Sequence, residues 1–192
     1  MFIDYLTLML INMSAGFAIL ALFVLSFING DRKKLAPGLL VSGFVALVTG
    51  FHEIFTWPII SSYNIPFGEM SVLFGALLFG GAIALLRDWD LLSLGIYATF
   101  AGAASILLGI RMYSLGMTSE PLVSCAGFVL SGLMGILSLP VYLLRSKRLV
   151  RILATIALAG AAAIWLVFAG LGYWAHLANF AKWLPSTMPP AK

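Results

Sequence analysis

The stretch LLSLGIYATFAGAASILLGIRMY, residues 91–113, decides the fold class of this chain. It is apolar apart from Arg111 near its end, and its length matches the roughly 20 residues that an α-helix needs to cross a hydrocarbon core about 30 Å thick. Small residues recur along it every three or four positions, at Gly95, Ala98, Gly102, Ser105 and Gly109. We therefore predict a membrane-spanning helix with one narrow face.

Five further apolar runs surround this stretch, and charges, Gly or Pro separate them. The six predicted helices lie at residues 5–28, 35–56, 69–86, 91–113, 121–144 and 151–176. Of the 192 residues, 62% are hydrophobic and 9% charged, which leaves too little polar surface to coat a soluble protein. We predict an all-α, polytopic integral membrane bundle of six transmembrane helices. It forms a single domain at residues 1–177, followed by a short outer tail at residues 178–192.

The basic residues predict the orientation of the bundle. Most of the eleven Lys and Arg residues follow the first, third and fifth helices: Arg32, Lys33, Lys34, Arg87, Arg145, Lys147, Arg148 and Arg151. The others are Arg111, Lys182 and Lys192. Because cytoplasmic loops carry an excess of Lys and Arg, we expect the odd-numbered connections to be cytoplasmic and both termini to lie outside. The net charge of +4 then reflects topology, and we expect the lipid bilayer, not nucleic acid, as the partner.

Residues with catalytic or metal-binding chemistry are scarce. Cys125 is the only cysteine, which excludes an intrachain disulfide and a CxxC pair. The chain has no Gly-rich phosphate loop, HExxH motif or Ser nucleophile elbow, which favours a protein without catalytic activity. Of the two histidines, His176 lies about 37 Å from Arg151 by helical rise, so its depth does not match that of His52. We predict no cofactor and no metal site, with one haem b or one metal ion as the upper limit.

Two other helices carry small residues at helical spacing. The fifth has Ser124, Gly127, Ser131, Gly135 and Ser138, and the third has Ala76, Gly80 and Ala84. Small side chains let backbones approach closely where lipid gives no hydrophobic drive for association. We therefore expect these faces and that of the fourth helix to form the tight contacts of the bundle.

The second helix carries the candidate functional site. Thr49, His52, Glu53 and Thr56 lie at positions i, i+3, i+4 and i+7, and we read them as one polar face with Ser42 two turns earlier. Ionisable groups inside a span are costly in lipid, so this face is expected to point into the bundle or a hydrated cavity. Helical rise from residue 35 puts His52 and Glu53 roughly 26 Å across, near the outer edge of the hydrocarbon.

Two more charged residues reach the same outer level. In one interpretation, Glu53 and Glu69 are the carboxylates of an outward-opening polar site, Arg111 is their counter-charge and His52 titrates near neutral pH. In the other, Glu69 favours the amino end of the third helix through its dipole, and Arg111 snorkels to the interface. The sequence leaves both interpretations open.

Residues 50–69, GFHEIFTWPIISSYNIPFGE, resemble an uncharacterised family of bacterial and archaeal multi-pass membrane proteins with a similar TWP, YN and FGE series after the second helix. The resemblance implies a protein of unknown function in a prokaryotic inner or cytoplasmic membrane, and it implies no reaction, substrate or cofactor. It draws attention to an outer loop with Trp57, Pro58, Tyr63, Asn64 and Gly68. Because Pro58 ends the second helix and residues 63–66 read as a turn, we expect this loop to cover the polar face.

Three function classes remain open. A small ion- or solute-handling protein would use the outward-facing polar site on the second helix. A non-catalytic accessory subunit would use the small-residue faces and the outer loop for contacts in a larger membrane complex or a homo-oligomer. A haem- or metal-binding membrane protein, or an enzyme, would need ligands that are scarce in this sequence.

Overall fold

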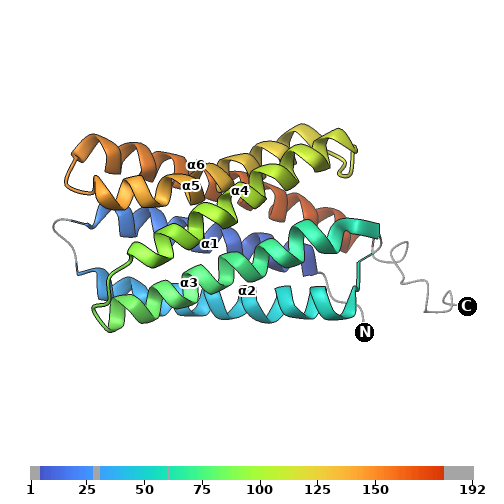
Figure 1. Ribbon diagram of the computed structural model, residues 1–192. Helices are drawn as coiled ribbons and strands as arrows, with labels where there is room; N and C mark the ends of the chain where they lie inside the picture. Colours follow the sequence, from blue (N-terminus) through green and yellow to red (C-terminus); the bar gives the residue numbers. More distant parts are fainter. Residues whose placement is uncertain (1–4, 28–30, 60, 180–192) are drawn as a thin grey trace, which may run out of the picture.

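The computed structural model describes residues 5–27, 31–59 and 61–179 (Figure 1). These residues form the helices α1 (Tyr5–Leu25), α2 (Ala36–Thr56), α3 (Met70–Leu86), α4 (Leu92–Ser114), α5 (Pro121–Leu143) and α6 (Arg148–Asn179), and no strand. Short 3-10 helices lie at Arg32–Leu35 and Ser61–Tyr63, and a π-helix at Ile65–Glu69 leads into α3. Six helical segments are long and apolar enough to cross a membrane, so the predicted all-α bundle is confirmed. Most of the predicted tail, residues 180–192, lies outside the described residues.

The six helices associate as three close antiparallel pairs, α1 with α6, α2 with α3 and α4 with α5. Figure 1 shows α2 and α3 along one side of the bundle and α4, α5 and α6 along the other. Contacts between pairs are sparser, above all those between α3 and α4. The space between the pairs is therefore where the bundle has room for an internal cavity.

The α4–α5 pair packs through the small face that the sequence predicted for α4. All five residues of the α4 face are buried. A Cβ atom on Gly102 would lie 2.7 Å from the Ile136 nitrogen and collide with the Gly132 carbonyl, so the two backbones are in direct contact. The Ser105 hydroxyl donates to the Phe128 carbonyl at 2.8 Å across this contact. These observations confirm the predicted face of α4. The face predicted for α5 was wrong in part: Gly132 and Gly135 meet α4, whereas a Cβ on Gly127 would lie 2.8 Å from the Trp165 ring of α6.

The α2–α3 pair is as close, but the contact face predicted for α3 was wrong. Gly43 and Gly50 of α2 face α3, and a Cβ on Gly43 would lie 2.5 Å from the Phe79 nitrogen. On α3 the close residue is Gly75, whereas a Cβ on Gly80 would make only an ordinary 3.5 Å contact with a Leu94 side chain. The glycines of α2 pack against the α3 face that carries Gly75. This face begins one residue before the predicted Ala76 edge, and one residue turns a helix by roughly 100°.

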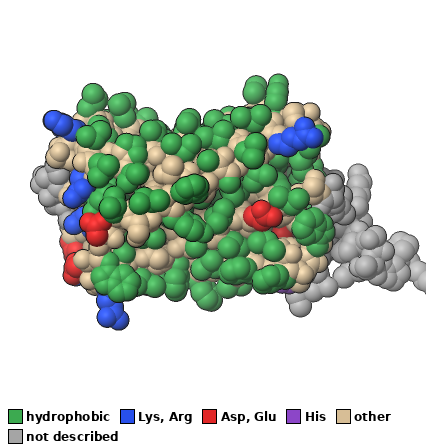
Figure 2. Space-filling view, in the orientation of Figure 1, with side chains coloured by type: hydrophobic (Ala, Val, Ile, Leu, Met, Phe, Trp, Pro, Cys, Tyr) green, Lys and Arg blue, Asp and Glu red, His purple; other side chains and the backbone are tan. Residues whose placement is uncertain are grey.

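The two ends of the bundle differ in charge. The connections after α1, α3 and α5 lie at one end, which we call the basic end, and Figure 2 shows most of the visible Lys and Arg side chains there. The connections after α2 and α4 lie at the opposite end. This grouping is the one that the charge pattern requires. That the basic end faces the cytoplasm, with both termini outside, stays a prediction.

Candidate functional site

The polar face of α2 divides between the interior and the surface. Thr49 is 8% exposed and Glu53 is 0% exposed, whereas His52 and Thr56 are exposed. Each pair is spaced by four residues, so its two members point the same way. Neighbouring residues of a helix are rotated by about 100°, so His52 points away from the direction of Glu53. The interior pair continues the face that carries Gly43 and Gly50, so the contact with α3 draws Glu53 into the bundle.

Glu53 is a buried carboxyl group without a hydrogen-bond partner. Among the described residues, no donor or acceptor reaches either of its side-chain oxygens. The nearby Thr49 hydroxyl is directed elsewhere and donates to the Val45 carbonyl at 2.8 Å. Burying a polar group without a hydrogen bond costs several kcal/mol, and an isolated ionised carboxylate costs more. An unsatisfied carboxyl of this kind needs either a proton or a bound cation to be stable.

The start of α3 closes the site from one side. A Cβ atom on Gly68 would lie 3.3 Å from both Cβ and Cγ of Glu53, so the bare backbone of this glycine packs on the glutamate side chain. Gly68 belongs to the π-helix Ile65–Glu69, whose wider turn is a feature often found at functional sites. A larger residue at this position would push the α3 entrance away from Glu53.

The loop between α2 and α3 is ordered by its own hydrogen bonds. Trp57 takes a left-handed conformation with φ 49°, and its N–H donates to the Glu53 carbonyl at 3.0 Å, which ends α2. Asn64 is fully buried, and its side chain accepts from the Ile59 N–H at 3.1 Å and donates to the Ile59 carbonyl. Pro58 and Tyr63 lie between these two points, exposed and half-buried. These hydrogen bonds hold Asn64 against Ile59, and the coverage of the polar face by this loop stays a prediction.

Aromatic rings connect this loop region to α5 and α6. Tyr63 stacks near Phe67 with ring centroids 6.5 Å apart, and Phe67 meets Phe128 edge-on at 5.5 Å. Phe128 in turn meets Trp165 edge-on at 5.4 Å. Offset and edge-on pairs add to the stability of such contacts. The residues that lead to Gly68 are thus fixed to the other half of the bundle.

Glu69 and Arg111 do not join Glu53. Both are exposed, and neither forms an ion pair among the described residues. The Arg111 guanidinium instead donates to the Ser114 hydroxyl at 3.3 Å. Glu69 makes no side-chain capping hydrogen bond at the start of α3. The predicted counter-charge for Glu53 is therefore absent from its surroundings, because the rotation of α4 turns Arg111 toward the surface.

The two histidines lie on different helices and in different surroundings. His52 is exposed on α2, whereas His176 of α6 is half-buried and its Nδ1 lies 3.3 Å from the hydroxyl of the buried Thr7. This contact belongs to the α1–α6 pair. Among the described residues, no three His, Cys, Asp or Glu side chains gather closely enough to hold a metal ion.

Sequence reasoning missed the glycines that position Glu53. Gly43 and Gly50 are seven residues apart on α2, the spacing of one helix face, and Gly75 is their counterpart on α3. This spacing was visible in the sequence. The polar residues of α2 were the stronger signal for the inward face of this helix, so the neighbouring glycine face was not recognised as a contact with α3.

One comparison with known proteins matches this chain. The family described as "Protein of unknown function (DUF981)" matches residues 1–179, so the chain belongs to this family. No curated protein matches the sequence. No solved structure matches it either. The family establishes a relationship and no activity, so the function of the chain rests on the chemistry of the site itself.

Proposed function

We propose that this member of the DUF981 family is a small proton-handling membrane protein in which Glu53 takes up and releases the proton. The observation that supports this proposal is the Glu53 carboxyl group, which is 0% exposed and lacks a hydrogen-bond partner among the described residues. Ionisable groups inside membrane spans are costly, so they mark ion pathways and proton relays more often than they serve stability.

A proton suits this site better than a metal cation. Cations such as Ca²⁺ and Mg²⁺ take six or more oxygen ligands, several of them water or carboxylate. Glu53 has the Gly68 backbone against its side chain, and the carboxylate of Glu69 is turned to the surface. A proton neutralises the carboxyl group without any further ligand. The resting state in this proposal is therefore the neutral acid.

Release of the proton requires a path from Glu53 to water at the nearer end of the bundle. The loop of residues 57–68 lies between the ends of α2 and α3, and its closed form depends on the two hydrogen bonds between Asn64 and Ile59. Opening of these bonds would let water reach the carboxyl group, which then transfers its proton to that water. Closure of the loop and uptake of a proton from the opposite side of the membrane restore the resting state, so that each cycle carries one proton across.

Purified protein in liposomes tests this function. An imposed membrane potential drives proton movement, and a pH-sensitive dye trapped inside the liposomes reports it. We expect flux with the wild-type protein, loss of flux with Glu53→Gln and retained flux with Glu69→Gln, whose carboxylate lies nearby but exposed. Gln is neutral and of similar size, so thermal stability is expected to hold in both variants. A wild-type protein without flux, or a fully active Glu53→Gln variant, contradicts the proposal.

A further inference from the structure

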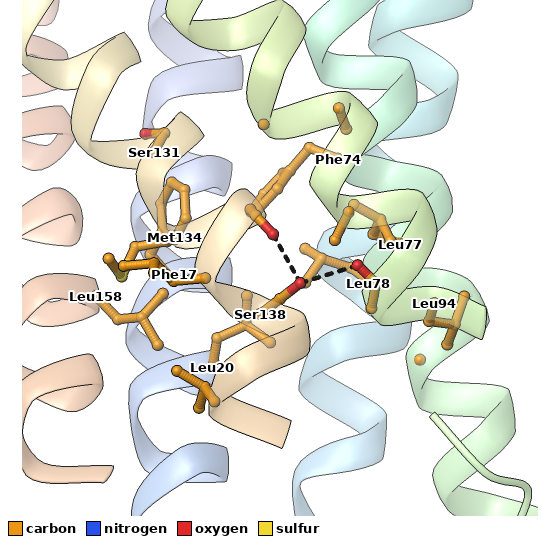
Figure 3. Close-up of a pocket in the computed structure, with 18 of the residues that line it drawn as sticks. Phe17, Leu20, Phe74, Leu77, Leu78, Leu94, Ser131, Met134, Ser138 and Leu158 are labelled. Atoms are coloured by element: carbon orange, nitrogen blue, oxygen red, sulfur yellow. Dashed lines mark hydrogen bonds between the residues drawn. The ribbon is translucent and has the colours of Figure 1, made fainter. Parts of the chain in front are cut away.

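A cavity of about 240 Å³ lies between the helix pairs, away from Glu53. Its walls come from α1, α3, α4, α5 and α6, and they are almost entirely apolar. Figure 3 shows Phe74 and Leu77 of α3 across from Met134 and Ser138 of α5, with Phe17 of α1 beside them. The Ser138 hydroxyl is occupied, since it donates to the Gly135 carbonyl at 2.7 Å. The cavity therefore offers hydrocarbon contacts and few polar ones.

The cavity is elongated along the membrane normal. Its lining runs from Leu91, the residue before α4, to Ser105 of α4, and 14 residues (105 − 91) at about 1.5 Å each give a length of roughly 21 Å. Half of a hydrocarbon core is roughly 15 Å thick, so the cavity has the length of one acyl chain of a lipid leaflet. Leu137 lines the cavity and is 42% exposed, so the space is also open to the outside of the bundle, where lipid lies.

At the basic end, the apolar cavity meets a second, polar cavity of about 490 Å³. Phe27, Leu91 and Tyr142 line both, so they form the boundary between an apolar and a polar compartment. The polar compartment lies at the level where the lipid head groups of this leaflet lie. An elongated apolar space joined to a polar mouth fits an amphiphile that inserts one tail into the apolar space.

The polar mouth carries charges of both signs. Its walls include the carboxylates Asp31, Asp88 and Asp90 and the cations Arg32, Lys33 and Arg145. Lys33 and Asp88 pair with each other at 2.6 Å, and the Tyr142 hydroxyl donates to Asp90 at 2.7 Å.

Asp31 also accepts from the Lys33 N–H at 3.1 Å and Asp90 from the Leu92 N–H at 2.7 Å, so among the described residues the second oxygens of Asp31 and Asp88 remain for a ligand. Arg32 forms no ion pair among the described residues. The Arg145 guanidinium lies over the Tyr142 ring, 4.2 Å from its centroid, and donates to the Tyr142 carbonyl at 2.8 Å. A purely anionic head group would meet three carboxylates there, and a purely cationic one would meet three cations. A head group with a phosphate next to an ammonium complements both the cations and the carboxylates of the mouth.

We infer that the joined cavities are a binding site for one zwitterionic phospholipid, with an acyl chain in the apolar cavity and its head group in the polar mouth. Arg32 and Arg145 face the phosphate, and the carboxylates of the mouth face the ammonium. The site is separate from Glu53 and from the proposed proton handling, because Glu53 lines neither cavity.

Trp165 gives a direct probe of the inserted tail, because it lines the apolar cavity and is 2% exposed. In a protein whose other tryptophans, Trp57, Trp89, Trp174 and Trp183, are replaced by Phe, its emission reports the cavity alone. The titrant is phosphatidylethanolamine with bromine near the end of one acyl chain, added to the protein in detergent. We expect Trp165 emission to be quenched until one lipid is bound per protein. Absence of saturable quenching overturns the inference.

Two glycines provide a matched control for the cavity. A Cβ atom on Gly81 or on Gly170 would meet nothing within 4 Å, so at both positions a new side chain begins in open space. Gly81 lines the apolar cavity and Gly170 does not. Gly81→Leu is therefore expected to abolish saturable quenching, and Gly170→Leu to leave it unchanged. Equal quenching in the two variants shows that the tail binds elsewhere and overturns the inference.

The head group is tested with lipids that share the same brominated chains. Phosphatidylethanolamine is expected to bind more tightly than the anionic phosphatidylglycerol, and more tightly than a brominated alkane without a head group. Arg145→Gln is expected to weaken binding, whereas Lys147→Gln, at the same end but outside the cavity, is not. Equal or tighter binding of phosphatidylglycerol or of the alkane overturns the assignment of a zwitterionic lipid.

Discussion

Gly102→Ala is the smallest change that tests the α4–α5 contact. The added Cβ would lie 2.7 Å from the Ile136 nitrogen and 3.0 Å from the Gly135 carbonyl carbon, and it would collide with the Gly132 carbonyl oxygen. Ordinary van der Waals contact begins near 3.4 Å, so α4 and α5 must separate by at least about 0.7 Å (3.4 − 2.7) to clear the Ile136 nitrogen, and by more to clear the Gly132 oxygen. All three opposing atoms are backbone, and no rotamer change can move them aside.

This separation sets the size of the effect. A gap of 0.5–1 Å forfeits roughly a quarter to a half of each dispersion contact across it, and dispersion is the main force between helices in lipid. Overpacking of a close contact typically costs about 1–3 kcal/mol. Because the collision involves backbone on both helices, we expect Gly102→Ala to lose about 2–3 kcal/mol of unfolding free energy.

Reversible unfolding in mixed micelles with increasing SDS measures this loss. Gly170→Ala is the control, because its Cβ meets nothing within 4 Å and alanine in a helix is favoured over glycine by about 0.5–1 kcal/mol. The two substitutions are chemically identical and are expected to have opposite signs. If Gly102→Ala is as stable as Gly170→Ala, the backbones of α4 and α5 are not in contact at this position.

Two further predictions concern orientation and acid stability. A cysteine at Ser61 is expected to react with an impermeant reagent added outside and a cysteine at Ser146 is not, in a background without Cys125, and the reverse pattern contradicts the predicted orientation. At the basic end, the hydrogen bond from Tyr142, helped by one from the Leu92 N–H, holds the pKa of Asp90 below its ordinary 3.8. A lowered folded pKa stabilises the fold above the unfolded pKa, and this contribution is lost as pH falls through the folded pKa. Thermal unfolding scans of Asp90→Asn should therefore show a weaker loss of stability below pH 3.8 than wild-type scans, and parallel curves would contradict the contact.

The helices could be predicted well from the sequence because long apolar runs, and the charged, Gly or Pro residues that separate them, are strong signals. The bounds of the fourth and fifth helices were predicted to within one residue. The predicted ranges were 91–113 and 121–144, and the helices span Leu92–Ser114 and Pro121–Leu143. The sixth continues to Asn179, beyond the predicted end at residue 176. There no Pro or Gly interrupts the helix, and hydropathy does not mark where the chain leaves the hydrocarbon.

The site was predicted in part, because its outcome depends on helix rotation. Glu53 stood out as an acidic residue in an apolar span, and the structure buries it. Its neighbour His52 points to the surface, although the two are adjacent in sequence, because one residue turns a helix by about 100°. A pairing of Arg111 with Glu53 depends on the rotation of α4 relative to α2. That rotation is set by the glycine contacts with α5, and the polarity of the individual spans does not reveal it.

Infrared difference spectroscopy tests most directly whether Glu53 is a protonated, buried carboxylic acid. A protonated carboxyl group has a carbonyl stretching band that carboxylates and amides lack. For the purified wild-type protein at neutral pH we expect this band, and we expect it to be absent in Glu53→Gln and retained in Glu69→Gln. A wild-type spectrum without the band, or a band that persists unchanged in Glu53→Gln, would contradict the assignment of Glu53 as the proton-carrying group.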